Sequence, residues 1–266
     1  MSHAIEIEKE TGQSHPCHSD ITLTLIHLPQ GFALAKNTTK SIYELLAETP
    51  ELALRFSGSM GALSASEEYD LTFVLDHYDW ASLGAARVDI GGSEGHVSVA
   101  LAKRFPNLEL VVQDMAQVLG QGAANLPADL KDRVSFMAHD MFRPQTVEAD
   151  VYYMRWILHN WSDKNCKCIL EALIPVLKKG SRILIQDFYM PKPGQVALWK
   201  EKDARAMDLN MTATFSGLER TADDWKALFQ AADPRFVLHE IIQPKGSALS
   251  LLDVRWKIDK RNATLA

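Results

Sequence analysis

The stretch Val88-Asp89-Ile90-Gly91-Gly92-Ser93-Glu94-Gly95 decides the fold of this chain. The apolar run at 87–90 predicts a buried strand, and a helical pattern begins directly after the glycines, over 94–105. Glycines let a ligand approach the backbone closely, and a helix start presents free N–H groups. Asp114 ends the next predicted strand, where a carboxylate can bind both hydroxyls of a ribose. Together these features predict a site for a nucleotide-like cofactor.

Short apolar runs alternate with amphipathic segments along the rest of the chain. Strands are predicted at 87–90, 108–113, 134–138, 151–156 and 182–186, and helices at 94–105, 115–123, 163–178, 197–213 and 221–231. This alternation is typical of βαβ units and predicts a doubly wound, Rossmann-like α/β fold with a mostly parallel sheet. The runs 236–242 and 247–256 flank a turn at 243–246 and predict a C-terminal antiparallel hairpin.

The chain before this pattern has a different character. Residues 1–37 are interpreted as a mobile or reduced N-terminal segment, because the first twenty are polar and mixed in sign. Residues 38–80 carry helical periodicity, for example at Ile42, Leu45 and Leu46, and predict a short helical cap. Residues 81–266 are then the cofactor-binding domain.

Composition excludes several classes of partner. The formal net charge is −6 with no cluster of Lys and Arg, which argues against nucleic acid. No apolar run reaches membrane-spanning length and no signal peptide pattern opens the chain, so a cytoplasmic protein without a membrane partner is expected. Cys166 and Cys168 form a C-x-C pair without a neighbouring Cys or His cluster, so no metal site is predicted.

The glycine loop narrows the cofactor class. It is not the G-x-G-x-x-G pattern of dinucleotide sites, and Asp89 stands directly before its glycines. A carboxylate there disfavours a pyrophosphate but attracts the ammonium group of an amino-acid-like cofactor.

Six motifs, taken in order, resemble the plant and fungal caffeate-type class I O-methyltransferases over roughly residues 40–256. They are Val88–Gly95, Arg104-Phe105-Pro106, Gln113-Asp114-Met115, Asp140-Met141-Phe142, Arg155-Trp156-Ile157-Leu158-His159-Asn160-Trp161 and Glu219-Arg220-Thr221. The resemblance implies S-adenosylmethionine as cofactor. The implied cofactor residues are Asp89, Gly91 and Gly95 at the methionine end, Asp114 at the ribose, Asp140 and Met141 at the adenine, Met115, and Arg155, which stands near the cofactor where the family usually has Lys.

By the same resemblance, His159 is the general base and is flanked by two carboxylates, Asp187 and Glu219. This trio suits methyl transfer, because a phenol with a pKa near ~10 is a poor nucleophile until its proton leaves. A neutral imidazole can accept that proton, and a nearby carboxylate orients the ring.

An acceptor cavity is predicted from apolar and aromatic residues near these motifs. The candidates are Met154, Phe188, Met207, Asp208 and Met211. Methionine fits flat, irregular acceptors because its thioether is flexible and polarizable. Core packing explains the methionines equally, and Asp208 can face either solvent or substrate.

Two departures from the family pattern bear on function. Asn160 replaces the Asp that commonly follows the base, and the family's N-terminal dimerisation domain is absent or reduced to the first forty residues. A monomer or weak homodimer is therefore expected. Three functions remain open: an O-methyltransferase for a phenolic or enolic, aromatic or polyketide-like small molecule of secondary metabolism; a non-methylating relative that catalyses dehydration, cyclisation or a pericyclic step; and a non-catalytic accessory subunit.

Overall fold

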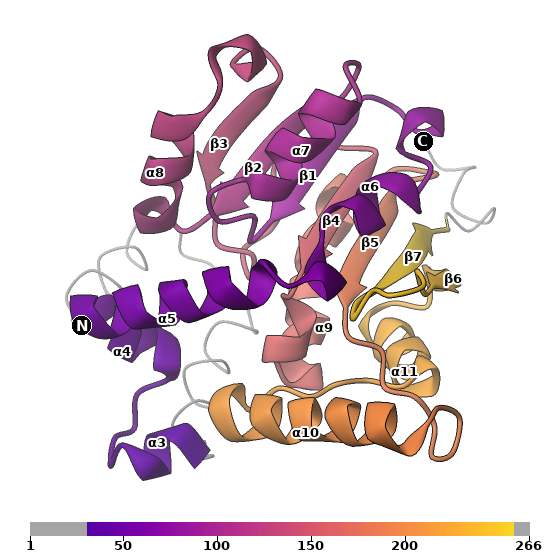
Figure 1. Ribbon diagram of the computed structural model, residues 1–266. Helices are drawn as coiled ribbons and strands as arrows, with labels where there is room; N and C mark the ends of the chain where they lie inside the picture. Colours follow the sequence, from indigo (N-terminus) through magenta and orange to yellow (C-terminus); the bar gives the residue numbers. More distant parts are fainter. Residues whose placement is uncertain (1–30, 258–266) are drawn as a thin grey trace, which may run out of the picture.

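The computed structural model describes residues 31–257, and a seven-stranded sheet of order β3-β2-β1-β4-β5-β7-β6 forms their centre (Figure 1). The strands are β1 (Ala86–Ile90), β2 (Glu109–Asp114), β3 (Val134–Ala138), β4 (Val151–Arg155), β5 (Arg182–Asp187), β6 (Phe236–Ile242) and β7 (Ser250–Trp256). Strands β1 to β5 pair in parallel, whereas β7 is antiparallel to both β5 and β6. The predicted doubly wound sheet with a C-terminal antiparallel hairpin is confirmed.

Helices cover both faces of the sheet. They are α3 (Gly31–Ala35), α4 (Ile42–Glu48), α5 (Pro50–Ser64), α6 (Thr72–Asp76), α7 (His96–Arg104), α8 (Ala116–Asn125), α9 (Asp163–Leu173), α10 (Leu198–Phe215) and α11 (Ala222–Ala232). Apolar side chains of α9 and α11 form one core with β1, β4 and β5, and those of α6, α7 and α8 form a second core on the other face. The predicted helix over 163–178 ends at Leu173 and continues as a 3-10 turn, because Pro175 has no N–H to extend the α-helical ladder.

The N-terminal cap predicted at 38–80 contains α4, α5 and α6. Ser41 and Glu44 form a capping box that starts α4. In Figure 1, α5 runs across the lower end of the parallel strands, and α10 lies farther down, below α9 and α11. Residues 1–30 of the predicted mobile segment, and 258–266 of the predicted cofactor domain, lie outside the described residues. Within 31–257, the structure contains no helix with the length and apolar character needed to cross a membrane.

The order in which the chain adds strands to the sheet reverses between β1 and β4. The chain first adds β2 and β3 on one side of β1 and then returns to place β4 on the other side. Open α/β sheets bind ligands in the crevice beyond the carboxyl ends of such a strand pair. Gly91 follows β1, and a Cβ built on it would lie 2.4 Å from Cδ1 of Ile157, which follows β4. The loops after β1 and β4 therefore meet at this edge.

Candidate active site

The glycine loop has the backbone conformation that its residues allow. Gly91 and Gly95 have φ values of +69° and +77°, in the left-handed region that glycine adopts at no steric cost. Ser93 also lies there, with φ of 52°, although it has a side chain. A Cβ on Gly95 would lie 3.0 Å from the Phe136 ring, so this position requires glycine both for its conformation and for space.

Asp114 ties this loop to the next helix. Its Oδ2 accepts a hydrogen bond from the Ser93 amide (3.0 Å) and its Oδ1 accepts one from the Met115 amide (2.7 Å). Burial raises the pKa of Asp114, while these two amides favour its charged form. The carboxylate is thus held at the end of β2, and each oxygen can still accept a further hydrogen bond.

Asp89 is buried at the end of β1, and the Ser98 hydroxyl donates to its Oδ2 over 2.7 Å. Burial raises the pKa of Asp89 to about 6. Ser98 lies on α7 and was not predicted, because a serine inside a helical pattern carries no signal of its own. The predicted contact of Asp89 with a cofactor ammonium stays a prediction.

The predicted adenine side lies after β3. Asp140 Oδ1 accepts a hydrogen bond from the Phe142 amide over 3.0 Å, and Met141 packs against the core. Sequence reasoning missed two buried amides that anchor this segment. Gln113 and Gln145 donate to each other over 3.0 and 2.7 Å, which fastens the chain after β3 to β2.

His159, Glu219 and Asp187 converge at the same edge of the sheet, as the sequence predicted for their location. His159 lies in a 3-10 turn, Leu158–Asn160, and its Nδ1 is 3.0 Å from Glu219 Oε1. All three side chains are buried, with exposed fractions of 6%, 5% and 0% for His159, Glu219 and Asp187. The Glu219 amide donates to Asp208 Oδ1 over 2.8 Å, so Asp208 helps to hold Glu219 in place.

The two carboxylates govern the charge of the imidazole. Burial alone would lower the pKa of His159, but Asp187 and the hydrogen-bonded Glu219 outweigh it, and the net shift is upward. Burial raises the pKa of Asp187 to about 6. Within residues 31–257, Oε2 of Glu219 has no hydrogen-bond partner, and Asp187 makes no hydrogen bond of full geometry, although the backbone amide of His159 lies near enough to act against the rise of its pKa. Because unpaired buried acceptors are costly, these oxygens can bind a donor group of a ligand.

The predicted acceptor residues Phe188 and Met207 are partly exposed, whereas Met154 and Met211 are buried. Phe188 stacks on His159, with ring centroids 6.0 Å apart and an interplanar angle of 26°. Met207 is half-buried on α10. Met154 and Met211 are buried, and Met154 belongs to the core between β1 and α9. The role of these residues toward an acceptor stays a prediction, and for Met154 the core contacts supply a structural role.

The cap adds two aromatic residues that the sequence did not indicate. The Tyr69 ring packs edge-on against Trp156 (5.2 Å) and Phe188 (6.1 Å), and Tyr43 stacks on Trp161 (6.2 Å). Arg155, predicted near the cofactor, donates through Nη2 to the Tyr69 carbonyl over 2.7 Å. Arg155 therefore fastens the cap to the end of β4.

Gly217 is pressed against the turn that carries His159. A Cβ at this position would lie 2.0 Å from the His159 carbonyl oxygen, which no side chain rearrangement can relieve. We expect Gly217→Ala to lower the free energy of unfolding by about 1–3 kcal/mol, the usual cost of overpacking. Urea unfolding measures this loss. Gly120→Ala in α8 is the control, since its Cβ would meet nothing within 4 Å, and equal stability of the two variants would contradict the contact.

Comparison with known proteins decides the family. A family model described as O-methyltransferase domain matches residues 28–233. The chain belongs to this O-methyltransferase family. Its curated relatives include the O-methyltransferase PaMT of Phomopsis amygdali, 46% identical over 226 residues that cover 84% of this chain and 53% of that protein. The grayanic acid biosynthesis cluster O-methyltransferase of Cladonia grayi is 43% identical over 231 residues, covering 86% of this chain and 51% of that protein.

A solved structure shares this fold. The structure of LepI in complex with S-adenosylmethionine superimposes with a TM-score of 0.69 at 26% identity, covering 86% of this chain and 58% of that one. This O-methyltransferase domain spans about half the length of the curated relatives that it matches.

Proposed function

We propose that the protein is an S-adenosylmethionine-dependent O-methyltransferase that acts on a phenolic or enolic small molecule, with His159 as general base. One observation carries the proposal: His159 Nδ1 lies 3.0 Å from Glu219 Oε1 in a buried position beyond the ends of β4 and β5. A carboxylate on Nδ1 selects the tautomer with its proton there, which leaves Nε2 as a proton acceptor.

The residues around the glycine loop fit S-adenosylmethionine. Gly91 and Gly95 leave room at the backbone, and Asp114 retains acceptor capacity for ribose hydroxyls. Asp89 would lie toward the methionine ammonium, and Met115, Asp140 and Met141 toward the nucleoside. When bound, S-adenosylmethionine supplies an electrophilic methyl group on a sulfonium. No metal is needed for this chemistry.

The chain itself supplies orientation and proton transfer. With S-adenosylmethionine bound, the acceptor oxygen would receive the methyl group, and the chain's own residues would orient that oxygen and remove its proton. His159 Nε2 takes the phenolic proton, and Glu219 stabilises the imidazolium that results. Asp187 adds a second negative charge beside the ring, which is consistent with the raised pKa of His159. Phe188 restrains the ring by stacking.

The relatives support an acceptor from secondary metabolism, since one of them is the O-methyltransferase of a grayanic acid biosynthesis cluster. An aromatic or polyketide-like acceptor agrees with the Tyr69, Trp156 and Phe188 rings near His159. Three points stay predictions: the caffeate-type likeness, the monomeric or weakly dimeric state, and the cytoplasmic location.

A product assay tests the proposed function. The chain is incubated with S-adenosylmethionine and a panel of phenols and enols, and S-adenosylhomocysteine is measured by mass spectrometry. We expect its release to depend on the acceptor. Binding of S-adenosylmethionine without any release across the panel would contradict methyl transfer and would favour the non-methylating alternative. Absence of binding would favour an accessory role.

A further inference from the structure

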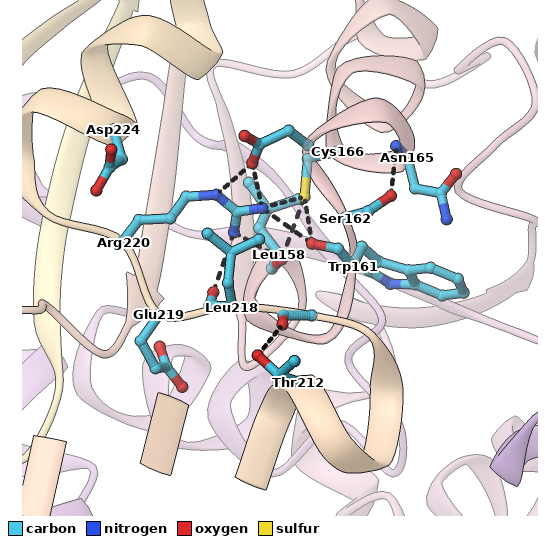
Figure 2. A network of polar contacts seen from close by, with 12 residues as sticks. Leu158, Trp161, Ser162, Asn165, Cys166, Thr212, Leu218, Glu219, Arg220 and Asp224 are labelled. Carbon is cyan, nitrogen blue, oxygen red and sulfur yellow. Dashed lines mark hydrogen bonds and ion pairs between the residues drawn. The ribbon is translucent and has the colours of Figure 1, made fainter. Parts of the chain in front are cut away.

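Arg220 follows Glu219 directly and is fully buried. Figure 2 shows its guanidinium between the chain before α11 and the turn that carries His159. Nη1 donates to the Leu158 carbonyl over 3.0 Å, and Nη2 donates to the Trp161 carbonyl over 2.9 Å. Leu158 and Trp161 bracket His159, so one planar group binds the main chain on both sides of the predicted base.

Further contacts strengthen this clamp on the turn of His159, among them Cys166 Sγ, 3.4 Å from Nη2, and the Trp225 ring, whose centroid lies 5.2 Å from Cζ of Arg220. Asp163, the first residue of α9, accepts hydrogen bonds from Nε (2.9 Å) and Nη2 (2.7 Å) of Arg220 through one oxygen. The Leu218 amide donates to the His159 carbonyl over 3.1 Å. The segment 218–220 therefore holds the base turn through its backbone and through Arg220, and the same segment carries Glu219.

Stability alone is a weak reason for this arrangement. A buried cation carries a large desolvation cost, and an apolar side chain of similar size often serves a core equally well. The side chain of Asp163, which pairs with Arg220, is 65% exposed and so offsets little of that cost. The guanidinium instead presents a rigid fork of donors, which fixes geometry better than a flexible ammonium. Its carbonyl partners, on Leu158, Trp161 and Leu218, all lie within two residues of His159 or Glu219.

We propose that Arg220 is a positioning residue for the general base: by binding the carbonyls of Leu158 and Trp161, it holds His159 Nδ1 against Glu219 and so aims Nε2 at the acceptor hydroxyl. This inference rests on the proposed function. It predicts that Arg220 affects proton removal and the tautomer of His159, whereas binding of the cofactor does not depend on it.

The kinetic test compares Arg220→Met and Arg220→Lys with Arg87→Met. Arg87 is also buried and also donates to backbone carbonyls, those of Ala86 and Trp80, but it lies at the opposite end of β1. For a neutral phenol, we expect Arg220→Met to lower kcat by about 10²-fold with little change in KM, the scale of a 1 Å misplacement of a reacting group. Arg220→Lys should be impaired similarly, because it keeps the charge but loses the fork. For an acidic acceptor, which is already ionised, either substitution should lower kcat much less. Arg87→Met should lower Tm without this difference between acceptors.

A second measurement does not need turnover. The ring nitrogens of His159 are observed by ¹⁵N NMR at a pH where the ring is neutral, with the signal assigned by its absence in His159→Gln. The wild type and Arg87→Met should show the single tautomer with the proton on Nδ1, and the Arg220 variants an average of two tautomers. The proposal would be overturned if a folded Arg220 variant showed a single tautomer of His159. It would also be overturned if the Arg220 variants lost kcat equally with the neutral and the acidic acceptor. If Arg220→Met does not fold, Arg220→Lys decides by the same comparison. If the wild type methylates nothing, the proposed function fails, and the tautomer still decides the role of Arg220.

Discussion

His159→Gln is expected to lower kcat for a neutral phenol by about 10²- to 10⁴-fold, the usual contribution of a general base. Glutamine has a similar size and can still donate to Glu219, but it cannot accept a proton. The affinity for S-adenosylmethionine should change little, because His159 lies beyond β4, whereas Asp114 ends β2 and the glycine loop follows β1. Steady-state kinetics and calorimetric titration measure the two effects. His239→Gln, an exposed position on β6, is the control.

The pH dependence gives a further check on the same variant. The base works only as neutral imidazole, and the carboxylates beside it raise the pKa of His159 above the ordinary value. Turnover of a neutral phenol should therefore rise as the pH increases through that raised pKa, and this limb should vanish in His159→Gln. An acceptor with a pKa below about 7 is already ionised, so its turnover should fall much less in His159→Gln than the turnover of a neutral phenol. Full activity of His159→Gln toward a neutral phenol would show that the base is another group.

The elements that local sequence pattern encodes were predicted well. The apolar runs indicated each strand of residues 31–257 to within a few residues, and the glycine loop with Asp114 indicated the edge at which we propose that the cofactor binds. These signals are local, because strand burial and the positive φ of Gly91 and Gly95 depend on residues near in sequence. The convergence of His159, Asp187 and Glu219 followed from the family motifs together with the rule that parallel strands end at one edge.

Contacts between distant segments could not be predicted in this way. Trp156 has φ of 56°, which is uncommon for a bulky residue, and its ring contacts both the Arg155 guanidinium and the Tyr69 ring. The Tyr69 contact joins the cap to β4, and the Gln113–Gln145 pair joins β2 to a loop. A single tyrosine or glutamine carries no pattern that indicates its partner, so such contacts become visible only in the folded chain.

Asp114→Asn is expected to weaken S-adenosylmethionine binding by about 10²-fold or more. A hydrogen bond to a charged group contributes about 1.5–3 kcal/mol, and a ribose can donate two of them to one carboxylate. In the wild type, ligand at a hundredfold excess over Kd should raise the free energy of unfolding by about 2.7 kcal/mol, and the variant should lose most of this gain at the same concentration.

The substitution keeps the shape of the side chain, but it costs the loop one of its two hydrogen bonds to Asp114, so the stability of the ligand-free variant is measured beside its affinity. Asparagine keeps one carbonyl oxygen for either the Ser93 or the Met115 amide, both of which the carboxylate now binds. The matched control is Glu109→Gln, at the other end of β2, where a carboxylate is exposed and distant from the loop. Calorimetric titration at equal pH and salt gives Kd for the three proteins. Equal affinity of the Asp114→Asn variant and the wild type would mean that Asp114 only holds the backbone, and the ribose would then need another acceptor at the end of β2.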